Sequence, residues 1–290
     1  MKIATFTHRG RQRLGLVEGD EVCDLAAADA ALPGDMIALL AGGRGALDAV
    51  RSAAARAPRL ALADVHLDAP VPKPPKLLAI GLNYASHAAE TGRAEPQFPI
   101  FFNKQTTCVT GPYDPIHRPR VSKALDYEGE LAFVIGKRCR HVPREHAHEV
   151  IAGYLICHDV SVRDWQFKAQ TLTLGKSFDT HGPLGPWLTT PEEVGDPHAL
   201  ELSTFVNGER RQHASTRELI HDCFAQVALL STVFTLEPGD VVSTGTPDGV
   251  AGAMKPPRWL VPGDVVRIEI DRLGHIENRV IEEPDETVVY

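Results

Sequence analysis

DYEGELAFVI, residues 126–135, is the stretch of this sequence that decides the fold. Acidic residues open it and five consecutive apolar residues close it, which is typical of a strand that enters a core. Because successive side chains of a strand point to opposite faces, Glu128 and Glu130 share one face. Two neighbouring carboxylates repel each other and are costly on a half-buried face unless a cation neutralises them. The residues alone leave two interpretations open, a cation site or the solvent side of an edge strand.

Further apolar runs with strand character lie on both sides of this stretch, and turn signals separate them. Asn207-Gly208 favours a tight hairpin because both residues tolerate a positive φ. Helices are predicted over residues 46–57, which are rich in alanine, and over the amphipathic segment 217–234. The fold class is therefore α+β and strand-dominated. Strands are predicted over residues 2–7, 14–17, 21–25, 76–81, 127–135, 151–157, 200–206, 241–244, 265–270 and 275–280.

Four prolines between residues 69 and 76 indicate where the chain divides. Prolines this dense stiffen a segment and remove backbone donors, which suits an extended linker. We expect a small N-terminal α+β domain over residues 1–70 and a larger catalytic domain over residues 71–290.

Composition argues against several classes of protein. The chain has 290 residues, a net charge of −8 and no dense block of lysine and arginine, so nucleic acid is not an expected partner. No apolar run approaches the roughly 20 residues that span a bilayer, and the first residues lack the apolar stretch of a signal peptide. Five cysteines without a C-x-x-C pair argue against a zinc ribbon or a disulfide framework. We expect a cytoplasmic protein with no membrane partner.

Asp159 adds a third carboxylate just beyond the apolar run 151–157. The tetrapeptide SVRD at residues 161–164 resembles a capping box that starts a helical turn. On that turn Arg163 and Gln166 share one face and could point at the same ligand. Three carboxylates without a thiolate or imidazole partner favour an ion that prefers oxygen, Mg²⁺ or Mn²⁺.

His87 and Glu90 are three residues apart in a segment that leaves a strand and enters a predicted helix, so they are neighbours on its surface. A carboxylate bonded to one imidazole nitrogen fixes the tautomer and leaves the other nitrogen free to act as a base. In isolation, the same spacing is also typical of a surface ion pair. The zinc-protease pattern H-E-x-x-H does not occur in the sequence.

Lys176 lies in a turn-rich segment, between Gly175 and Ser177. A phosphate-binding loop would also need a glycine five positions before Gly175, where Gln170 stands, so the sequence argues against nucleotide binding. A cation at Lys176 could instead neutralise a substrate carboxylate or a developing enolate.

Five ordered blocks spread over residues 76–280 together resemble the fumarylacetoacetate hydrolase family, and in particular bacterial acylpyruvases and 2-hydroxyhepta-2,4-diene-1,7-dioate isomerases. Residues 1–70 are similar to the small N-terminal domain of many bacterial members. Residues 103–106 depart from the usual pattern of the family, in which a more proline-rich sequence often follows the lysine that is Lys104 here. The blocks are GLNYxxHxxE at 81–90, DYEGEL at 126–131, DVSVRDxQ at 159–166, GKSFDT at 175–180 and GTPxGV at 245–250.

This resemblance implies a mixed β-sandwich roll, usually a homodimer, with one divalent metal ion per site. It implies that an acid/base dyad lies on a segment that closes over the substrate in the smaller members, here residues 85–97. The implied metal ligands are Glu128, Glu130 and Asp159, the dyad is His87 and Glu90, and the residues that contact substrate are Lys176, Arg163, Gln166 and Thr246.

The leading functional hypothesis is hydrolysis of a carbon–carbon bond in an acylpyruvate-like β-diketo acid, of the fumarylpyruvate or fumarylacetoacetate type. His87, oriented by Glu90, would remove a proton from water, and the metal with Lys176 would stabilise the departing enolate. The same constellation also suits oxaloacetate decarboxylation, and the isomerisation or decarboxylation of dienedioates in aromatic catabolism. A distant alternative is a non-catalytic protein that binds a divalent cation.

Overall fold

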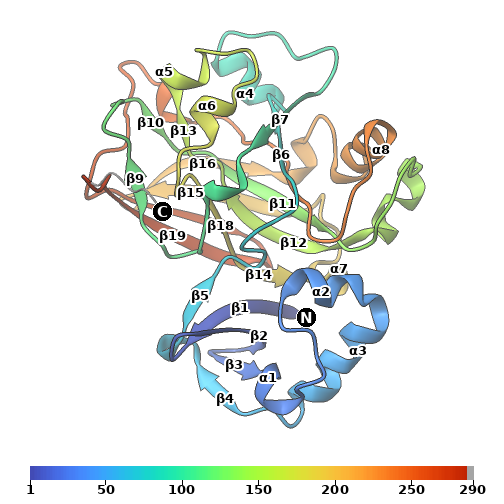
Figure 1. The fold of residues 1–290 in the computed structure, drawn as a ribbon. Helices are drawn as coiled ribbons and strands as arrows, with labels where there is room; N and C mark the ends of the chain where they lie inside the picture. The colour runs from blue at the N-terminus through green and yellow to red at the C-terminus, as the bar shows by residue number, and fades with distance from the viewer. Residues whose placement is uncertain (286–290) are drawn as a thin grey trace.

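The computed structural model describes residues 1–285, in which strands dominate and most helices are short (Figure 1). The strands are β1 Lys2–His8, β2 Arg11–Glu18, β3 Glu21–Asp24, β4 Arg59–Ala61, β5 His66–Asp68, β6 Leu77–Gly81, β7 Ile100–Lys104, β8 Val109–Thr110, β9 Ile116–Arg118, β10 Leu125–Asp126, β11 Gly129–Ile135, β12 Ile151–His158, β13 Ser161–Val162, β14 Gly182–Thr189, β15 Glu201–Val206, β16 Glu209–Ser215, β17 Val241–Ser243, β18 Val265–Ile270 and β19 Gly274–Glu282. The α-helices are α1 Leu25–Ala28, α2 Met36–Ala41, α3 Gly43–Ala54, α4 Ala85–Glu90, α5 Arg163–Gln166, α6 Thr173–Lys176, α7 Pro191–Val194 and α8 Cys223–Val233, and the 3₁₀ turns are η1 Leu62–Asp64, η2 Thr106–Cys108, η3 Arg144–Glu149, η4 Thr216–Glu218 and η5 Ala251–Ala253.

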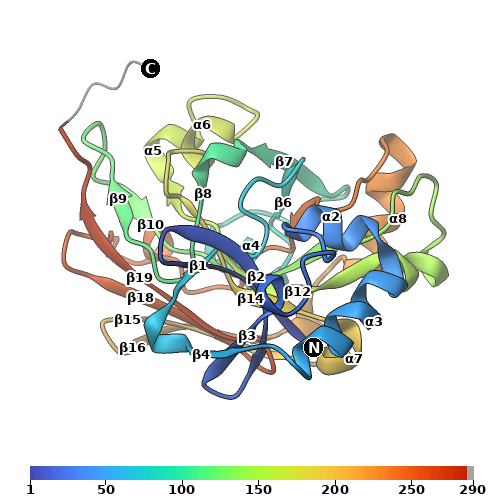
Figure 2. The same ribbon diagram turned by 60° about the horizontal axis from the view of Figure 1, so that its bottom comes forward.

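Two sheets organise residues 1–285. The larger has twelve strands, in the order β4-β3-β2-β1-β14-β12-β11-β17-β6-β7, with β5 beside β1 and β8 beside β14. The smaller has five strands in the order β16-β15-β18-β19-β9, and β10 pairs separately with β13. Figure 2 shows β15, β16, β18 and β19 along one flank of the molecule and α8 at the opposite flank. The strand-dominated α+β class predicted from the sequence is confirmed.

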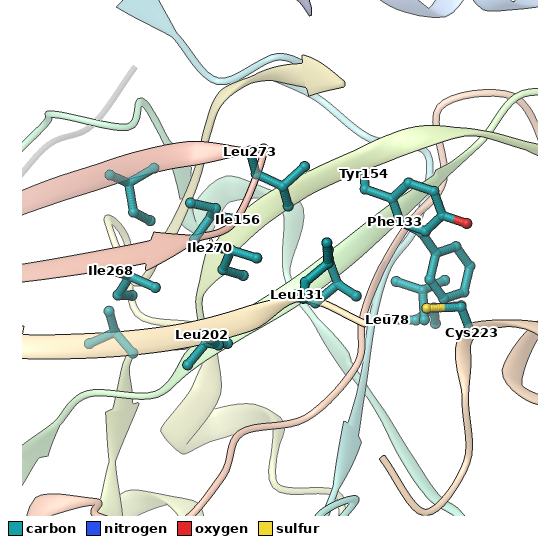
Figure 3. Close-up of a cluster of buried hydrophobic side chains, with 14 of the residues drawn as sticks. Leu78, Leu131, Phe133, Tyr154, Ile156, Leu202, Cys223, Ile268, Ile270 and Leu273 are labelled. Carbon is teal, nitrogen blue, oxygen red and sulfur yellow. The ribbon is translucent and has the colours of Figure 1, made fainter. Parts of the chain in front are cut away.

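Strand β11 contributes side chains to a hydrophobic core on each of its two faces, because alternate side chains of a strand point in opposite directions. Leu131 and Phe133 are buried in a cluster with residues of β12 and of the five-stranded sheet (Figure 3). Ala132 and Val134 belong to a second cluster, which also contains residues of α2 and α3. Glu130 is therefore on the side of the strand that faces the second cluster, as the alternation predicted.

The N-terminal strands continue the main sheet. β1 pairs with β14 in antiparallel register, with Ile3 opposite Leu188, and Ile3 lies in the same buried cluster as Val134 of β11. The proline-rich segment 69–76 then connects β5 to β6 without regular structure. We retain the division into domains at residue 70 as a proposal.

Two local predictions differ from the structure. The helix expected from residue 217 is α8 and begins at Cys223, because Asp222 caps it by accepting a hydrogen bond from the backbone N–H of Ala225. The capping box expected at residues 161–164 does not form, because Ser161 is paired in β13 and α5 has no side-chain cap. The hairpin at Asn207-Gly208 is confirmed, with both residues at positive φ. No helix within residues 1–285 has the length and apolar character needed to cross a membrane.

Candidate active site

Three buried carboxylates meet where β11 and β12 lie side by side. The register places Glu130 opposite Cys157, and the backbone N–H of Asp159 donates to the carbonyl of Glu128 at 2.9 Å. Glu128, Glu130 and Asp159 can each offer an oxygen within 4.8 Å of the others, and none is more than 4% exposed. The pairing of two strands thus brings together the three carboxylates that the sequence singled out.

The strand β17 and the turn after it hold Glu130 in place. Its Oε2 accepts from the Ser243 hydroxyl at 2.5 Å and from the backbone N–H of Gly245 at 2.8 Å. Gly245 has a φ of +99°, and a Cβ there would lie 2.8 Å from the side chain of Asn83, so glycine is required at this position.

Two lysines hold Asp159. Lys104, the last residue of β7, donates to Oδ1 at 2.5 Å, and Lys176, the last residue of α6, donates to Oδ2 at 2.7 Å. Lys176 also contacts Glu128 Oε2, so a single ammonium group bridges two carboxylates of the cluster. Burial lowers the pKa of Lys104, but the charge of Asp159 outweighs this and the net pKa is raised, which keeps the lysine charged.

Arg163 joins the cluster to a second buried carboxylate site. Its Nε donates to Asp126 at 2.8 Å, and its Nη1 contacts Glu128 Oε1 at 2.7 Å and Gln166 Oε1 at 3.0 Å. Arg163 Nη2 is buried and has no hydrogen-bond partner within residues 1–285. Asp126 itself accepts from the backbone N–H groups of η5 and so fixes that turn against the site.

The charges of the site leave room for a cation. Burial, together with the negative charges of Asp159 and Glu128, raises the pKa of Glu130 to about 8. Burial also opposes ionisation of Glu128, but the adjacent cations outweigh it and hold its pKa below the ordinary range. A divalent cation would stabilise the ionised form of Glu130, so the all-oxygen donor set fits Mg²⁺ or Mn²⁺. The formal charge of the site is −1, and a divalent ion would change it to +1. This charge is the sum over four carboxylates, Asp126, Glu128, Glu130 and Asp159, and three cations, Lys104, Arg163 and Lys176.

His87 and Glu90 form a hydrogen-bonded pair on α4, as their spacing predicted. His87 Nδ1 lies 2.7 Å from Glu90 Oε1, and Glu90 Oε2 accepts from the backbone N–H of Gly249 at 2.8 Å. The His87 side chain is only 8% exposed, so the pair is not the surface ion pair that the sequence left open. The carboxylate fixes one imidazole nitrogen and leaves Nε2 available for proton transfer.

Asn83 anchors the segment that carries this pair. Its side-chain amide donates to the carbonyls of His221 and Thr244, at 2.9 and 2.7 Å, and its Oδ1 accepts from the backbone N–H of His221 at 2.8 Å. The neighbouring Leu82 has a φ of +55°, a conformation that costs a non-glycine residue free energy. The chain therefore leaves β6 in a defined direction and delivers α4 to the site.

A cavity of about 540 Å³ connects these groups. Figure 1 shows α4, α5 and α6 together at the end of the molecule away from the N-terminal strands. Thr246 lines the cavity, but its hydroxyl already donates to the carbonyl of Gly129 at 3.0 Å and accepts from Gln212 at 2.8 Å. Its backbone N–H has no partner within the described residues. All nine residues predicted for the site line the cavity: His87, Glu90, Glu128, Glu130, Asp159, Arg163, Gln166, Lys176 and Thr246.

Sequence reasoning missed several residues that hold the site together. Lys104 could have been suspected because it stands at the end of an apolar strand. Asp126 is the first residue of the quoted stretch 126–135, but no role was predicted for it. Ser243 carries no sequence signal, since its role depends on the pairing of β17 with β11. These side chains orient the carboxylates and Arg163 through hydrogen bonds between distant segments.

Comparison with a protein-family model gives a match over most of the chain. Residues 76–281 match the family described as fumarylacetoacetate (FAA) hydrolase C-terminal. The matched range contains the whole of the cavity lining described above.

Individual proteins are similar over nearly the full length. The chain is 43% identical over 271 residues to "oxaloacetate tautomerase fahd2, mitochondrial" of Xenopus laevis, covering 92% of this chain and 85% of that protein. The structure of maleylpyruvate hydrolase from Sphingobium sp. SYK-6, in complex with manganese(II) ion and pyruvate, matches with a TM-score of 0.82 and 37% identity, covering 98% of this chain and 100% of that one. The structure of 2-hydroxyhepta-2,4-diene-1,7-dioate isomerase from Mycobacterium marinum matches with a TM-score of 0.77 and 32% identity, covering 98% and 99%.

Proposed function

Because the chain belongs to the fumarylacetoacetate hydrolase family, we propose that it is a Mg²⁺- or Mn²⁺-dependent enzyme that moves a proton at C3 of a 2-oxo dicarboxylic acid, as an oxaloacetate tautomerase. One observation carries the proposal: the buried His87–Glu90 pair and the cluster of three carboxylates line the same cavity. A base and a cation site around one small cavity suit chemistry at an acidic C–H bond beside a carbonyl group.

In this proposal Glu128, Glu130 and Asp159 hold the metal ion, which when bound polarises the 2-oxo group and makes the adjacent C–H bond more acidic. His87 Nε2 removes the proton from C3 as the double bond forms between C3 and C2. The oxygen on C2 takes up a proton, and the enol results. Glu90 fixes the imidazole tautomer throughout, and the ammonium of Lys176 stabilises negative charge on the reacting oxygen.

The cations of the cavity support a substrate with two carboxylates. Lys104, Arg163 and Lys176 are all paired with acidic side chains. Arg93 and Lys255 also line the cavity, and neither has an acidic partner in the chain up to residue 285. We assign these two to the distal carboxylate of the substrate.

The carboxylate next to the 2-oxo group needs donors of its own. Arg163 Nη2 and the backbone N–H of Thr246 both lack partners within residues 1–285, and Gln166 lines the cavity beside Arg163. We propose that these three groups hold that carboxylate, which makes specific the contact with substrate that the family resemblance implied for Arg163, Gln166 and Thr246.

Hydrolysis of an acylpyruvate-like β-diketo acid is the second candidate. It is favoured by the likeness to maleylpyruvate hydrolase, whose structure holds manganese and pyruvate and matches this chain over 98% of its length. The same residues would serve, with His87 removing the proton from water and the new hydroxyl ending on the acid released beside pyruvate. Tautomerisation is preferred because the relative that is 43% identical bears the name of an oxaloacetate tautomerase.

Two further properties belong to the proposal. We propose a homodimer, which the mass measured by size-exclusion chromatography with light scattering would test. We also propose a cytoplasmic location, although mitochondrial appears in the name of the Xenopus relative.

The test of function is a product analysis with Mg²⁺ present. Enol-oxaloacetate and a maleyl- or fumarylpyruvate are supplied separately, and enol absorbance, pyruvate, carbon dioxide and the second acid are measured. A tautomerase accelerates the loss of enol absorbance from oxaloacetate without forming pyruvate. Release of pyruvate with one equivalent of a second acid from the acylpyruvate would establish the hydrolase instead, and pyruvate with carbon dioxide from oxaloacetate would establish a decarboxylase. No acceleration of any of these reactions would contradict both candidates and leave the dienedioate and cation-binding alternatives.

A further inference from the structure

Each carboxylate of the cluster has one oxygen held by a donor other than Lys176. Lys176 contacts the second oxygen of Glu128 and of Asp159, and a metal ion would have to displace it to reach those two oxygens. The held oxygens are Glu128 Oε1, Glu130 Oε2 and Asp159 Oδ1, and their donors are respectively Arg163, the Ser243 hydroxyl with the Gly245 amide, and Lys104.

This pattern limits how the carboxylates can bind a metal ion. A carboxylate that already accepts a strong hydrogen bond on one oxygen has only the other oxygen fully available as a ligand. Ca²⁺ takes six to eight oxygen ligands and commonly uses both oxygens of a carboxylate, whereas Mg²⁺ requires six ligands in near-ideal octahedral geometry. Three one-oxygen carboxylates, completed by water and substrate, suit the smaller octahedral ions.

Lys104 is the least exposed of the charged donors. Its side chain is 0% exposed and that of Asp159 is 1% exposed, so the ion pair is shielded from bulk solvent. The ammonium donates to Asp159 Oδ1 at 2.5 Å and to the backbone carbonyl of His181 at 3.0 Å. A charge-assisted bond anchored at a second point fixes both the position and the rotation of the carboxylate.

We propose that Lys104 is a positioning residue that keeps Asp159 a one-oxygen ligand and thereby gives the metal centre its preference for Mg²⁺ and Mn²⁺ over Ca²⁺. The inference rests on the divalent-metal site of the proposed function. It adds that selectivity between ions is built into the donors around the ligands, and not only into the ligands themselves.

Replacing Lys104 should change selectivity as well as affinity. Lys104→Met keeps the length and apolar stem of the side chain but removes the donor, so Asp159 Oδ1 becomes free to join the other oxygen in binding a large ion. Loss of a group that orients a ligand typically weakens metal binding about 10- to 100-fold. We expect that loss for Mn²⁺, a smaller loss for Ca²⁺, and so a shift of about tenfold or more in the ratio of the two affinities.

The experiment titrates the metal-free protein with Mn²⁺, follows free Mn²⁺ by electron paramagnetic resonance, and then displaces bound Mn²⁺ with Ca²⁺. This readout does not depend on activity. Lys76→Met is the matched control, because Lys76 pairs at 2.7 Å with Asp240, which is also fully buried, but neither residue lines the cavity. Lys76→Met should have the same ratio of Mn²⁺ to Ca²⁺ affinity as the unmodified protein. Thermal unfolding in chelator shows whether each variant is folded.

Ser243→Ala gives a second test that does not depend on the Lys104 variant folding. It removes one of the two donors to Glu130 Oε2 while the Gly245 amide remains. The ratio of the Mn²⁺ affinity to the Ca²⁺ affinity should therefore fall, but by less than in Lys104→Met. If the unmodified protein binds no Mn²⁺, the proposed metal site fails. If it binds Mn²⁺ but neither variant changes the ratio, or the control changes it equally, the role of Lys104 is refuted while the proposed function stands.

Discussion

His87 is the side chain to which we assign the proton transfer. It is buried in the cavity wall, and Glu90 and Gly249 fix the orientation of its ring through a chain of two hydrogen bonds. An imidazole held in this way exchanges one proton per turnover without having to search for its orientation.

Removing the imidazole should therefore be far more damaging than weakening its support. His87→Ala is expected to lower kcat by about 10²–10⁴-fold, and Glu90→Gln by less, because the amide perturbs the tautomer but leaves the base. Steady-state kinetics measure both effects, and Mn²⁺ titration should show unchanged affinity in both variants. Loss of the metal in His87→Ala would mean that the histidine is a ligand and that its assignment as the base is wrong.

Glu130 makes the effect of pH on stability predictable. Its pKa of about 8 in the metal-free fold lies above the value of about 4.5 expected for an exposed glutamate. Between these two values the unfolded chain has lost a proton that the folded chain retains, so this residue lowers the stability of the metal-free protein as pH rises from about 4.5 to 8. A bound divalent ion displaces that proton and removes the penalty.

Mn²⁺ should consequently raise the melting temperature more at pH 8 than at pH 5.5, as measured by thermal unfolding with and without the ion. Glu130→Gln should flatten the dependence of metal-free stability on pH in that interval, because an amide does not titrate. An equal Mn²⁺ effect at both pH values in the unmodified protein would show that Glu130 does not hold a proton in the metal-free fold.

At the scale of elements, the strands place the carboxylates and the short helices bring the bases and cations to them. β11 and β12 fix Glu130 and Asp159 through their register. His87 lies in the middle of the short helix α4, and Lys176 is the last residue of α6. A site divided in this way can keep its metal ligands rigid while the segment that carries the base moves.

We expect that motion in residues 85–97, which contain α4 and the start of the following loop. Thr91, Gly92 and Arg93 line the cavity, and all three are exposed. Hydrogen exchange with and without oxalate, a mimic of the pyruvate enolate, should show slower exchange in this segment when the ligand is bound. Exchange in β11 should change little and serves as the internal control. Identical exchange of residues 85–97 in both states would contradict closure.

The elements also show what the sequence could and could not predict. The alternation in β11 and the three-residue spacing of His87 and Glu90 are local, so the shared face and the hydrogen-bonded pair followed from the sequence. Ser161 was misassigned because its pairing with Asp126 in β10 is a tertiary contact that outweighs local capping. Lys104 and Ser243 were missed because their partners lie 55 and 113 residues away in the chain.

At the scale of the whole molecule, the carboxylate cluster depends on both sheets and on the turns between them. The five-stranded sheet closes one hydrophobic core beneath β11 and β12. The N-terminal strands and helices close the other. Glu130 therefore reaches the carboxylate cluster from a strand buried on both faces, which limits how far water shields the repulsion among the carboxylates.

The central claim is that these carboxylates hold a divalent ion on which the proton-transfer chemistry depends. Its most direct test is to titrate the chelated protein with Mn²⁺ while measuring bound metal and the rate of enol-oxaloacetate consumption in the same samples. The account predicts negligible catalysis without metal and a rate that rises in proportion to occupancy, with neither binding nor rate recovered in Glu128→Gln. Full activity in the presence of chelator, or Mn²⁺ binding that leaves the rate unchanged, would contradict it.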